Sequence, residues 1–358
     1  MRFIFKTRYD QDIALARHGG DRFWYSLLVL ALVAAPWLLP EYWLAQLSFV
    51  FIYAIVAVGL MLLAGFTGQF SIGHAAFMGI GAYAEAYLAA RGWPLAASLA
   101  CAMALAAAAG VVVGLPALRV KGMYLAIATL SFGFIVEEAL ARWESVTGGN
   151  AGKSVPAPRM LGYALDSTES FYFLCLVCVV GSTLVVLNLL RAPTGRAFVA
   201  IRDSEVSAQS MGIQLARYKS LSFAISAALA GLGGALYGHK MQFISPEQFS
   251  LVQSIDLVLM VVIGGLGSIH GVFFGAIFLI GMPQLISLGK DHLPAAIGQA
   301  TGLQSVVYGA VLIAFVMLEP MGLYGRWLKV RTWLQLYPFY RRGMFKRQKS
   351  FQKSERLK

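Results

Sequence analysis

The feature that most constrains this chain is a succession of long apolar runs that contain few charges. A helix needs about 20 apolar residues to cross the hydrocarbon core of a bilayer. Because lipid offers the backbone no hydrogen-bond partners, each crossing segment must satisfy its own N–H and C=O groups as a helix. The composition agrees with a lipid environment, since 58% of the 358 residues are hydrophobic and 13% are charged, against about 25% charged residues in soluble domains.

These runs predict an all-α integral membrane protein, a polytopic bundle of about ten transmembrane helices with Gly-rich interrupted segments. The expected spans are 23–39, 44–64, 72–90, 95–115, 123–141, 171–190, 220–238, 255–268, 271–288 and 303–319.

The basic residues indicate which side of the membrane each connecting segment faces. Cytoplasmic segments of membrane proteins are enriched in Lys and Arg. With the N-terminus inside, 23 of the 29 basic residues lie on the inner side, in segments 1–22, 116–122, 191–219 and 326–358. We therefore expect both termini to be cytoplasmic. Most of the net charge of +12 then lies on the cytoplasmic side, where basic residues can contact anionic lipid or a cytoplasmic partner. Nucleic-acid binding is not needed to explain this charge.

The segment "TGGNAGKS" (147–154) is similar to a phosphate-binding P-loop but lacks its first glycine. The motif requires Gly, four residues, then Gly-Lys followed by Ser or Thr, and the first of these positions holds Thr147. The charge distribution also places this segment on the external side, away from ATP. Two readings remain open, a partner-facing or gating loop and a flexible connector.

Two Gly-rich segments, 65–82 and 264–276, interrupt the apolar runs. Small residues in membrane helices allow close packing or local unwinding. Paired interruptions in the two halves of a chain are also typical of the substrate path of transporters. Tight helix packing with satisfied polar groups remains the alternative. The residues that we expect along a path are Gly65, Thr67, Gln69, Ser71, His74, Gly264, Gly265 and Ser268.

Acidic and histidine residues give little support for other membrane activities. The acidic residues within or beside the apolar runs fall near the ends of expected spans, where water reaches them; they are Glu85, Glu137, Glu138, Asp256 and Glu319. The shortage of acidic residues in the middle of the spans argues against a proton-driven carrier. The five histidines show no H-x-x-x-H or H-E-x-x-H spacing, so no metal site or membrane-embedded enzyme is indicated.

The connecting segment 191–219 predicts a short amphipathic helix over 197–211, ended by Gly212. Its apolar side is formed by Phe198, Ile201, Val206 and Met211. Such a helix, tethered at both ends to spans, fits a groove on another protein or lies in the lipid headgroups. The residues alone leave both readings open.

The chain resembles the branched-chain amino-acid permease family of ABC importers, of the LivM type. The resemblance covers about residues 45–325 and is most specific in "GFTGQFSIGHAAFMGIGAY" (65–83), "LRVKGMYLAIATLSFG" (118–133), "TGGNAGKS" (147–154), "GRAFVAIRDSEVSAQSMGI" (195–213) and "VVIGGLGSIHGVFFGA" (261–276). It divides the chain into a cytoplasmic N-terminal segment (1–22), a transmembrane permease domain (23–325) and a basic cytoplasmic tail (326–358).

The resemblance also implies roles for particular residues. The segment with Arg202, Glu205, Ala208 and Gly212 is the counterpart of the coupling loop that docks into a cytoplasmic ATPase. The external segment carries Gly148, Gly149, Asn150 and Lys153, and Lys153 stands where the family usually has an apolar residue. This departure bears on contacts with an external binding protein or with the solute.

By the same resemblance, the chain is a transport subunit rather than an enzyme, in the inner (plasma) membrane of a bacterium. It would pair with a second permease as a hetero-dimer, bind two cytoplasmic ATPase subunits and receive its solute from an external binding protein. ATP and Mg²⁺ would be bound by the ATPases, and no cofactor by this chain. The expected solute is a branched-chain or related amino acid; the alternatives are an aromatic acid, an amide or urea, or a different class, an ion-coupled carrier or channel.

Overall fold

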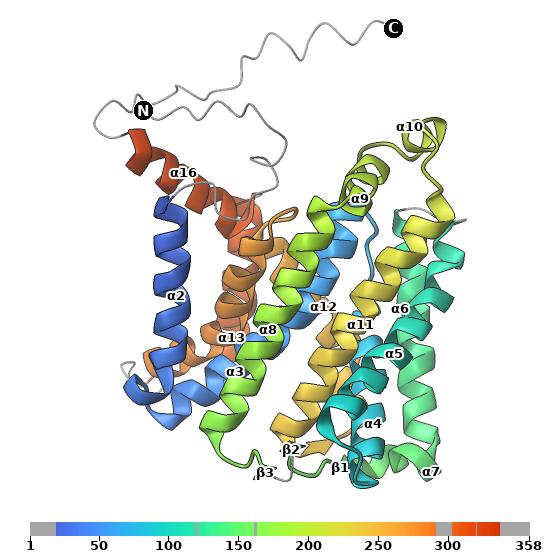
Figure 1. The fold of residues 1–358 in the computed structure, drawn as a ribbon, viewed down its shortest axis with the longest axis vertical. Helices are drawn as coiled ribbons and strands as arrows, with labels where there is room; N and C mark the ends of the chain where they lie inside the picture. The colour runs from blue at the N-terminus through green and yellow to red at the C-terminus, as the bar shows by residue number, and fades with distance from the viewer. Residues whose placement is uncertain are drawn as a thin grey trace, which may run out of the picture.

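The computed structural model describes residues 19–118, 120, 122–160, 163–290, 303–319 and 321–336, and these are almost entirely helical (Figure 1). Most of the expected N-terminal segment and residues 337–358 of the expected tail lie outside the described residues. Residues 322–336 form a helix, α16 (Gly322–Leu336), so the expected domain boundary at 325 falls inside it.

Each of the expected spans corresponds to one helix. In chain order these are α2 (Gly19–Leu38), α3 (Glu41–Met61), α4 (His74–Ala90), α5 (Leu95–Gly114), α6 (Met123–Arg142), α8 (Thr168–Arg191), α11 (Leu215–Met241), α12 (Leu251–Gly264), α13 (Ile269–Lys290) and α15 (Leu303–Leu318). Among the described residues, seven helices are long and apolar enough to cross a membrane, and α2 and α15 contain shorter apolar stretches. The α4 helix has 17 residues because the first Gly-rich segment precedes it. The fold is that of a polytopic, all-helical membrane protein.

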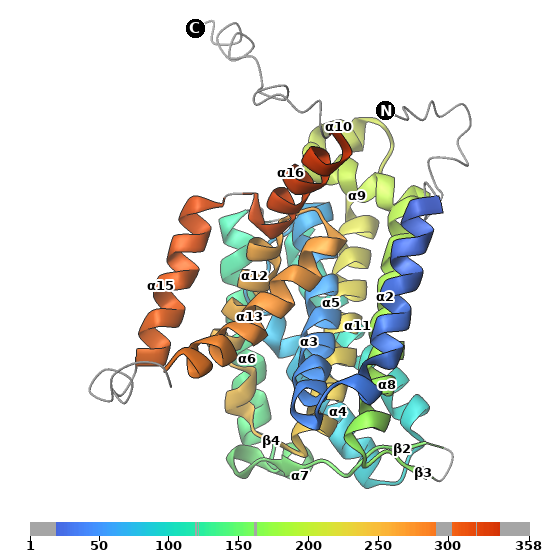
Figure 2. The same ribbon diagram turned by 90° about the vertical axis from the view of Figure 1, so that its left-hand side faces the viewer.

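The short segments lie at the two ends of the helical bundle (Figures 1 and 2). One end carries α9 (Pro193–Asp203), α10 (Glu205–Ser210), α16 and the start of α2. The opposite end carries α7 (Glu144–Thr147), the 3-10 turns Gly149–Ala151 and Pro246–Phe249, and four two-residue strands. There β1 (Lys153–Ser154) pairs antiparallel with β4 (Phe243–Ile244), and β2 (Arg159–Met160) with β3 (Tyr163–Ala164).

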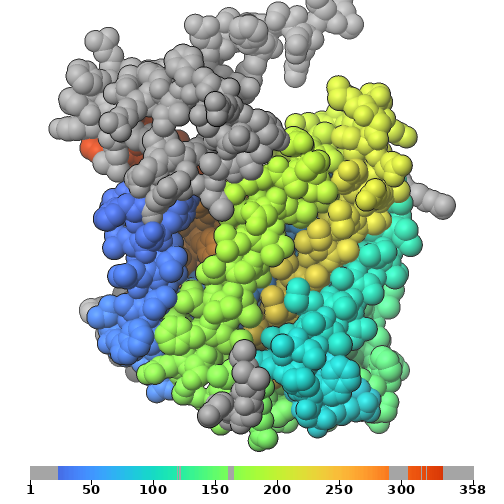
Figure 3. All heavy atoms as spheres, viewed as in Figure 1, coloured from blue at the N-terminus to red at the C-terminus, as the bar shows by residue number. Residues whose placement is uncertain are grey.

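The helices α3 and α11 form the centre of the bundle. Most of each is buried inside the chain, whereas α5, α6 and α8 expose broad apolar faces. Figure 3 shows one such face, on which α8 runs obliquely between α2 and α11. Exposed apolar faces are expected for helices that contact lipid or another membrane subunit.

Glycines allow α11 to pack closely against α4. A Cβ atom added to Gly234 would lie 1.9 Å from the carbonyl oxygen of Met78, and one added to Gly81 would lie 2.2 Å from that of Gly231. Real Cβ atoms do not approach so closely, so both positions require glycine. At least one glycine of the first Gly-rich segment, Gly81, is therefore required by helix packing.

Candidate functional site

The first Gly-rich segment begins with a change of helix type at the end of α3. Leu62–Phe66 form a π-helical turn, and residues 68–73 are non-helical before α4 begins at His74. Thr67 donates its hydroxyl hydrogen to the carbonyl of Leu63, and the backbone N–H of Gln69 donates to the same carbonyl. Single π turns inside α-helices occur often at functional sites. Gly68 adopts φ = +70°, a conformation that favours glycine.

The second Gly-rich segment separates α12 from α13. Gly265 and Gly267 have φ of +110° and +84°. The Ser268 hydroxyl accepts a hydrogen bond from the N–H of Gly271 at 3.2 Å, in the first turn of α13. Gly264 is enclosed by α13, because a Cβ there would lie 2.2 Å from the Gly271 carbonyl oxygen.

The structure brings the two segments into contact. The N–H of Gly267 lies 3.2 Å from the sulfur of Met61, and a Cβ on Gly65 would lie 2.8 Å from the nitrogen of Gly267. Two irregular backbones, some 200 residues apart, thus meet beside the end of α3. Non-helical backbone at membrane depth is tolerated only where protein buries it or where it lines a cavity.

The buried polar side chains of the first segment face α11. The Gln69 amide nitrogen donates to the Ser222 hydroxyl at 3.0 Å. Ser226 donates to the Gly59 carbonyl at 2.6 Å, so it must accept from Nε2 of His74 at 3.0 Å. His74 is therefore the Nε2–H tautomer, and its buried Nδ1 has no partner among the described residues. Ser71 is buried as well, and with Phe70 and Leu266 it lines a narrow pocket.

The segment expected to contact an ATPase differs from the prediction in shape. The predicted single helix over 197–211 is two helices, because Ser204 is extended and caps α10 by accepting a hydrogen bond from the N–H of Ser207 at 3.3 Å. Phe198 and Ile201 are buried as predicted, but Val206 and Met211 are 76% and 84% exposed. The break at Ser204 turns these two apolar side chains outward at the tip of α10.

Arg202, at the last turn of α9, contacts the meeting point of the two Gly-rich segments. Its Nη1 donates to the carbonyl of Gly65 at 3.1 Å, and its Cγ would lie 3.2 Å from a Cβ on Gly68. The same guanidinium pairs with the exposed Asp203 at 3.0 Å. A side chain of the connecting segment therefore holds the π turn of α3 directly.

A second ion pair joins this segment to α11. The Glu205 carboxylate lies 2.7 Å from Nζ of Lys219, whose side chain is 2% exposed. Ala208 is buried, and the N–H of Ile213 donates to its carbonyl; Gly212 between them has φ = +84°. The four residues expected in a coupling segment thus lie on α9, on α10 and in the turn that follows, and both charged ones bond to the membrane part of the chain.

Residues 147–154, expected to form an external segment, have a defined conformation with several hydrogen bonds. Gly148, Gly149 and Gly152 have positive φ, and the Thr147 hydroxyl lies 2.7 Å from the carbonyl oxygens of Leu140 and Trp143. Lys153 donates to the Val146 carbonyl at 2.6 Å and lies over the Tyr87 ring. Burial, with the nearby Arg91 guanidinium, lowers the pKa of Lys153 below its ordinary value. Asn150 is exposed at the tip.

One buried cluster was not anticipated from the sequence. The Glu85 carboxylate accepts from the Ser98 hydroxyl at 2.7 Å and lies 3.0 Å from Nε2 of His239, whose Nδ1 lies 3.0 Å from the Pro156 carbonyl oxygen. The expectation that Glu85 lies near water was wrong, because its side chain is fully buried. The partners are 154 residues apart, and no sequence signal joins them.

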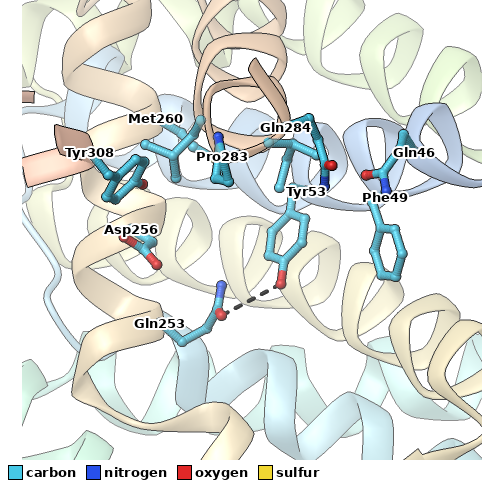
Figure 4. Close-up of a pocket in the computed structure, with 11 residues that line it drawn as sticks. Gln46, Phe49, Tyr53, Gln253, Asp256, Met260, Pro283, Gln284 and Tyr308 are labelled. Atoms are coloured by element: carbon cyan, nitrogen blue, oxygen red, sulfur yellow. Dashed lines mark hydrogen bonds between the residues drawn. The ribbon is translucent and has the colours of Figure 1, made fainter. Parts of the chain in front are cut away.

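A cavity of about 440 Å³ lies between α3, α12, α13 and α15 (Figure 4). The residues around it are Gln46, Phe49, Tyr53, Gln253, Asp256, Met260, Leu279, Ile280, Pro283, Gln284 and Tyr308. Asp256 was expected at the edge of a span, but α12 begins at Leu251 and places it inside the apolar segment Pro246–Gly264. None of the residues expected along a path lines this cavity.

Comparison with known proteins identifies the family. Residues 42–316 match the family described as branched-chain amino acid transport system / permease component. The chain is 33% identical to the high-affinity branched-chain amino acid transport system permease protein LivM of Escherichia coli K12, over 84% of this chain and 74% of LivM. It is 27% identical to LivH of the same strain, over 76% of this chain and 91% of LivH.

A more distant relative is the probable LivM of Methanocaldococcus jannaschii, 25% identical over 63% of this chain and 68% of the relative. No solved structure matches the chain. The family match covers most of the chain, including both Gly-rich segments and α9 and α10, so it agrees with the helical architecture. The chain therefore belongs to the family of permease components of branched-chain amino acid transport systems, and it is a membrane transport subunit rather than an enzyme.

Proposed function

We propose that this chain forms, with a second and similar permease, the membrane pathway for ATP-driven uptake of branched-chain or related amino acids. An external binding protein delivers the solute, and two cytoplasmic ATPase subunits bind ATP and Mg²⁺. The similarity of one chain to both LivM and LivH supports a pair of related permeases. The single observation that carries the mechanism is the bond from Arg202 to the Gly65 carbonyl, which joins the connecting segment to the π turn.

The end of the bundle with α9 and α10 faces the cytoplasm in this proposal. The start of α2 and α16 lie at this same end (Figure 1), and segments rich in Lys and Arg flank them. Val206 and Met211 give α10 an exposed apolar tip beside the exposed polar residues Ser207 and Ser210. An apolar centre with a polar rim is typical of a docking surface on another protein.

ATP binding then acts on the membrane helices through two contacts. When the ATPases close and move α10, the Glu205–Lys219 ion pair carries the displacement to α11. Arg202 carries it to the π turn and so to the contact between the two Gly-rich segments. ATP shifts the population between two access states because the connecting segment is held differently in each.

The external segment with Gly148, Gly149, Asn150 and Lys153 faces the binding protein in this arrangement. Its order supports the role, since three glycines and the Lys153–Val146 bond fix its shape. The exposed Asn150 is available for contact.

Reconstitution in proteoliposomes tests the function. The chain is purified with its partner permease and ATPases, and uptake of radiolabelled L-leucine is measured with the binding protein and with ATP inside or absent. We expect uptake only when ATP and both ATPases are present. Uptake without ATPases would instead identify a channel or an ion-coupled carrier.

Two substitutions test the coupling segment. Glu205→Lys places a cation beside the buried Lys219, and Gly212→Pro removes both the N–H and the positive φ at that position. Both are expected to abolish ATP-dependent uptake while the protein still inserts. Gln209→Ala, exposed on α10, is the matched control with uptake like wild type. Normal uptake in the two variants would contradict the assignment.

A further inference from the structure

The cavity between α3, α12, α13 and α15 is more polar than its place in the membrane requires. Six of its eleven lining side chains carry polar groups, from Gln46, Tyr53, Gln253, Asp256, Gln284 and Tyr308. Its volume of about 440 Å³ lies within the range of roughly 300–1,000 Å³ typical of small-molecule sites. Polar groups inside a membrane are costly unless they serve a solute, water or a partner.

The hydrogen-bond pattern leaves donors directed at the cavity. The Tyr53 hydroxyl donates to Oε1 of Gln253 at 3.5 Å, and Figure 4 shows the Gln253 amide nitrogen pointing from that bond toward the cavity. The Tyr42 hydroxyl donates to Oε1 of Gln284 in the same way. Each amide oxygen thus faces a tyrosine hydroxyl, and among the described residues neither NH₂ group has a hydrogen-bond acceptor, so both can donate to a ligand.

Asp256 lies on the same helix as Gln253 and gives the cavity a hydrogen-bond acceptor with a negative charge. Its carboxylate lies one helical turn from Gln253, and among the described residues it has no hydrogen bond or ion pair. A carboxylate within a membrane span nearly always has a cationic or hydrogen-bonding partner. Asp256 is therefore available to a cation or a hydrogen-bond donor that enters the cavity.

The remaining wall is apolar. Phe49, Met260, Leu279, Ile280 and Pro283 line the cavity beside the polar groups, on α3, α12 and α13. A ligand that satisfies all three features has a cationic end, an anionic end and an aliphatic body. An α-amino acid with an apolar side chain has this arrangement of groups.

We propose that this cavity is a solute subsite of the permease, in which Asp256 binds the ammonium group of an amino acid. Gln253 and Gln284 donate to the solute carboxylate, and the apolar wall contacts its side chain. This inference rests on the proposed function, and it adds the place and the recognition chemistry. In this proposal the Gly-rich segments change their conformation to open or close the pathway, and the cavity binds the solute.

Cysteine protection measures binding at the cavity directly. The assembled transporter carries Ile280→Cys as a reporter, with Cys101, Cys175 and Cys178 replaced by alanine. The rate of labelling by a small methanethiosulfonate is measured against L-leucine concentration, without the binding protein. L-leucine is expected to slow labelling, whereas 4-methyl-2-hydroxypentanoate, which lacks the ammonium group, is not.

Substitutions of lining residues then test which side chains bind the solute. Asp256→Asn is expected to raise the half-protecting L-leucine concentration by about tenfold or more, since a hydrogen bond to a charged group is lost. Gln253→Leu removes a donor without touching the carboxylate and is expected to weaken protection as well. Glu137→Gln, which neutralises a half-buried carboxyl of α6 outside the cavity, is the control with unchanged protection.

Several results would overturn the subsite. They are equal protection by the hydroxy acid, no shift in both cavity variants, or no protection by L-leucine in a transporter that takes it up. Failure of Asp256→Asn to assemble with the partner permease, while Glu137→Gln assembles, would show that a partner side chain occupies the cavity. Absence of any ATP-dependent amino-acid uptake by the wild type would instead refute the proposed function.

Discussion

At the residue scale, the geometry of one buried pair, Glu85 and His239, determines where a proton lies. The Pro156 carbonyl can only accept, so Nδ1 of His239 carries a hydrogen. Nε2 faces a Glu85 oxygen that already accepts from Ser98. One proton must therefore lie between Nε2 and the carboxyl group. The pair joins α4 and α11 to Pro156, in the connection between α7 and α8.

Substitutions at Glu85 and at His239 are expected to lower the stability of the protein by different amounts. His239→Ala leaves Glu85 buried with Ser98 alone, and the free energy of unfolding is expected to fall by about 3 kcal/mol or more. Glu85→Gln is expected to cost clearly less, because the Gln amide can donate to Nε2 of a neutral imidazole. Urea titration in detergent micelles, followed by tryptophan fluorescence, compares the variants. Equal losses in both would contradict the proton assignment.

At the element scale, the sequence predicts where the helices lie along the chain, but it does not predict the contacts between them. The length of each apolar run located the ten helices, since crossing a bilayer sets a minimum length. The approach of Gly65 to Gly267 and the grouping of Asp256 with residues of α3, α13 and α15 depend on residues distant in sequence. The break at Ser204 is local, because Ser204 caps α10 through Ser207, and the helical pattern of the segment did not reveal it. A hydropathy pattern contains no information about which faces meet, so the cavity was missed.

The crossing of α4 and α11 can be tested with one methyl group. Gly234→Ala puts a Cβ against the Met78 carbonyl, so the helices must separate, and stability is expected to fall by about 1–3 kcal/mol. Gly181→Ala in α8 meets no atom within 4 Å, and it is expected to be neutral or slightly stabilising because alanine favours helix. Thermal unfolding in detergent measures both. A destabilised Gly181→Ala would mean that this face is covered in the folded protein.

At the scale of the whole molecule, the proposed orientation puts the two ends of the bundle on opposite sides of the membrane. Single cysteines at Met211 and Asn150, both exposed, report on those ends in a cysteine-free background. A membrane-impermeant maleimide is expected to label Asn150→Cys in intact spheroplasts, and Met211→Cys only after permeabilisation. The reverse pattern would invert the assignment of both ends and exclude ATPase docking at α10.

Substitution of Arg202 tests whether ATP hydrolysis is coupled to transport through the contact between α9 and the π turn. Arg202→Ala removes the bond to the Gly65 carbonyl but leaves the exposed tip of α10 unchanged. The ATPases should therefore still bind and hydrolyse ATP, while solute uptake per ATP falls by about tenfold, as for loss of a charged hydrogen bond. Asp203→Asn removes only the neighbouring exposed ion pair and is expected to transport normally. Parallel measurement of uptake and phosphate release in proteoliposomes separates the outcomes. An equal loss of hydrolysis and uptake in Arg202→Ala would show that Arg202 serves assembly, and the link from α9 to the π turn would then not be the route of coupling.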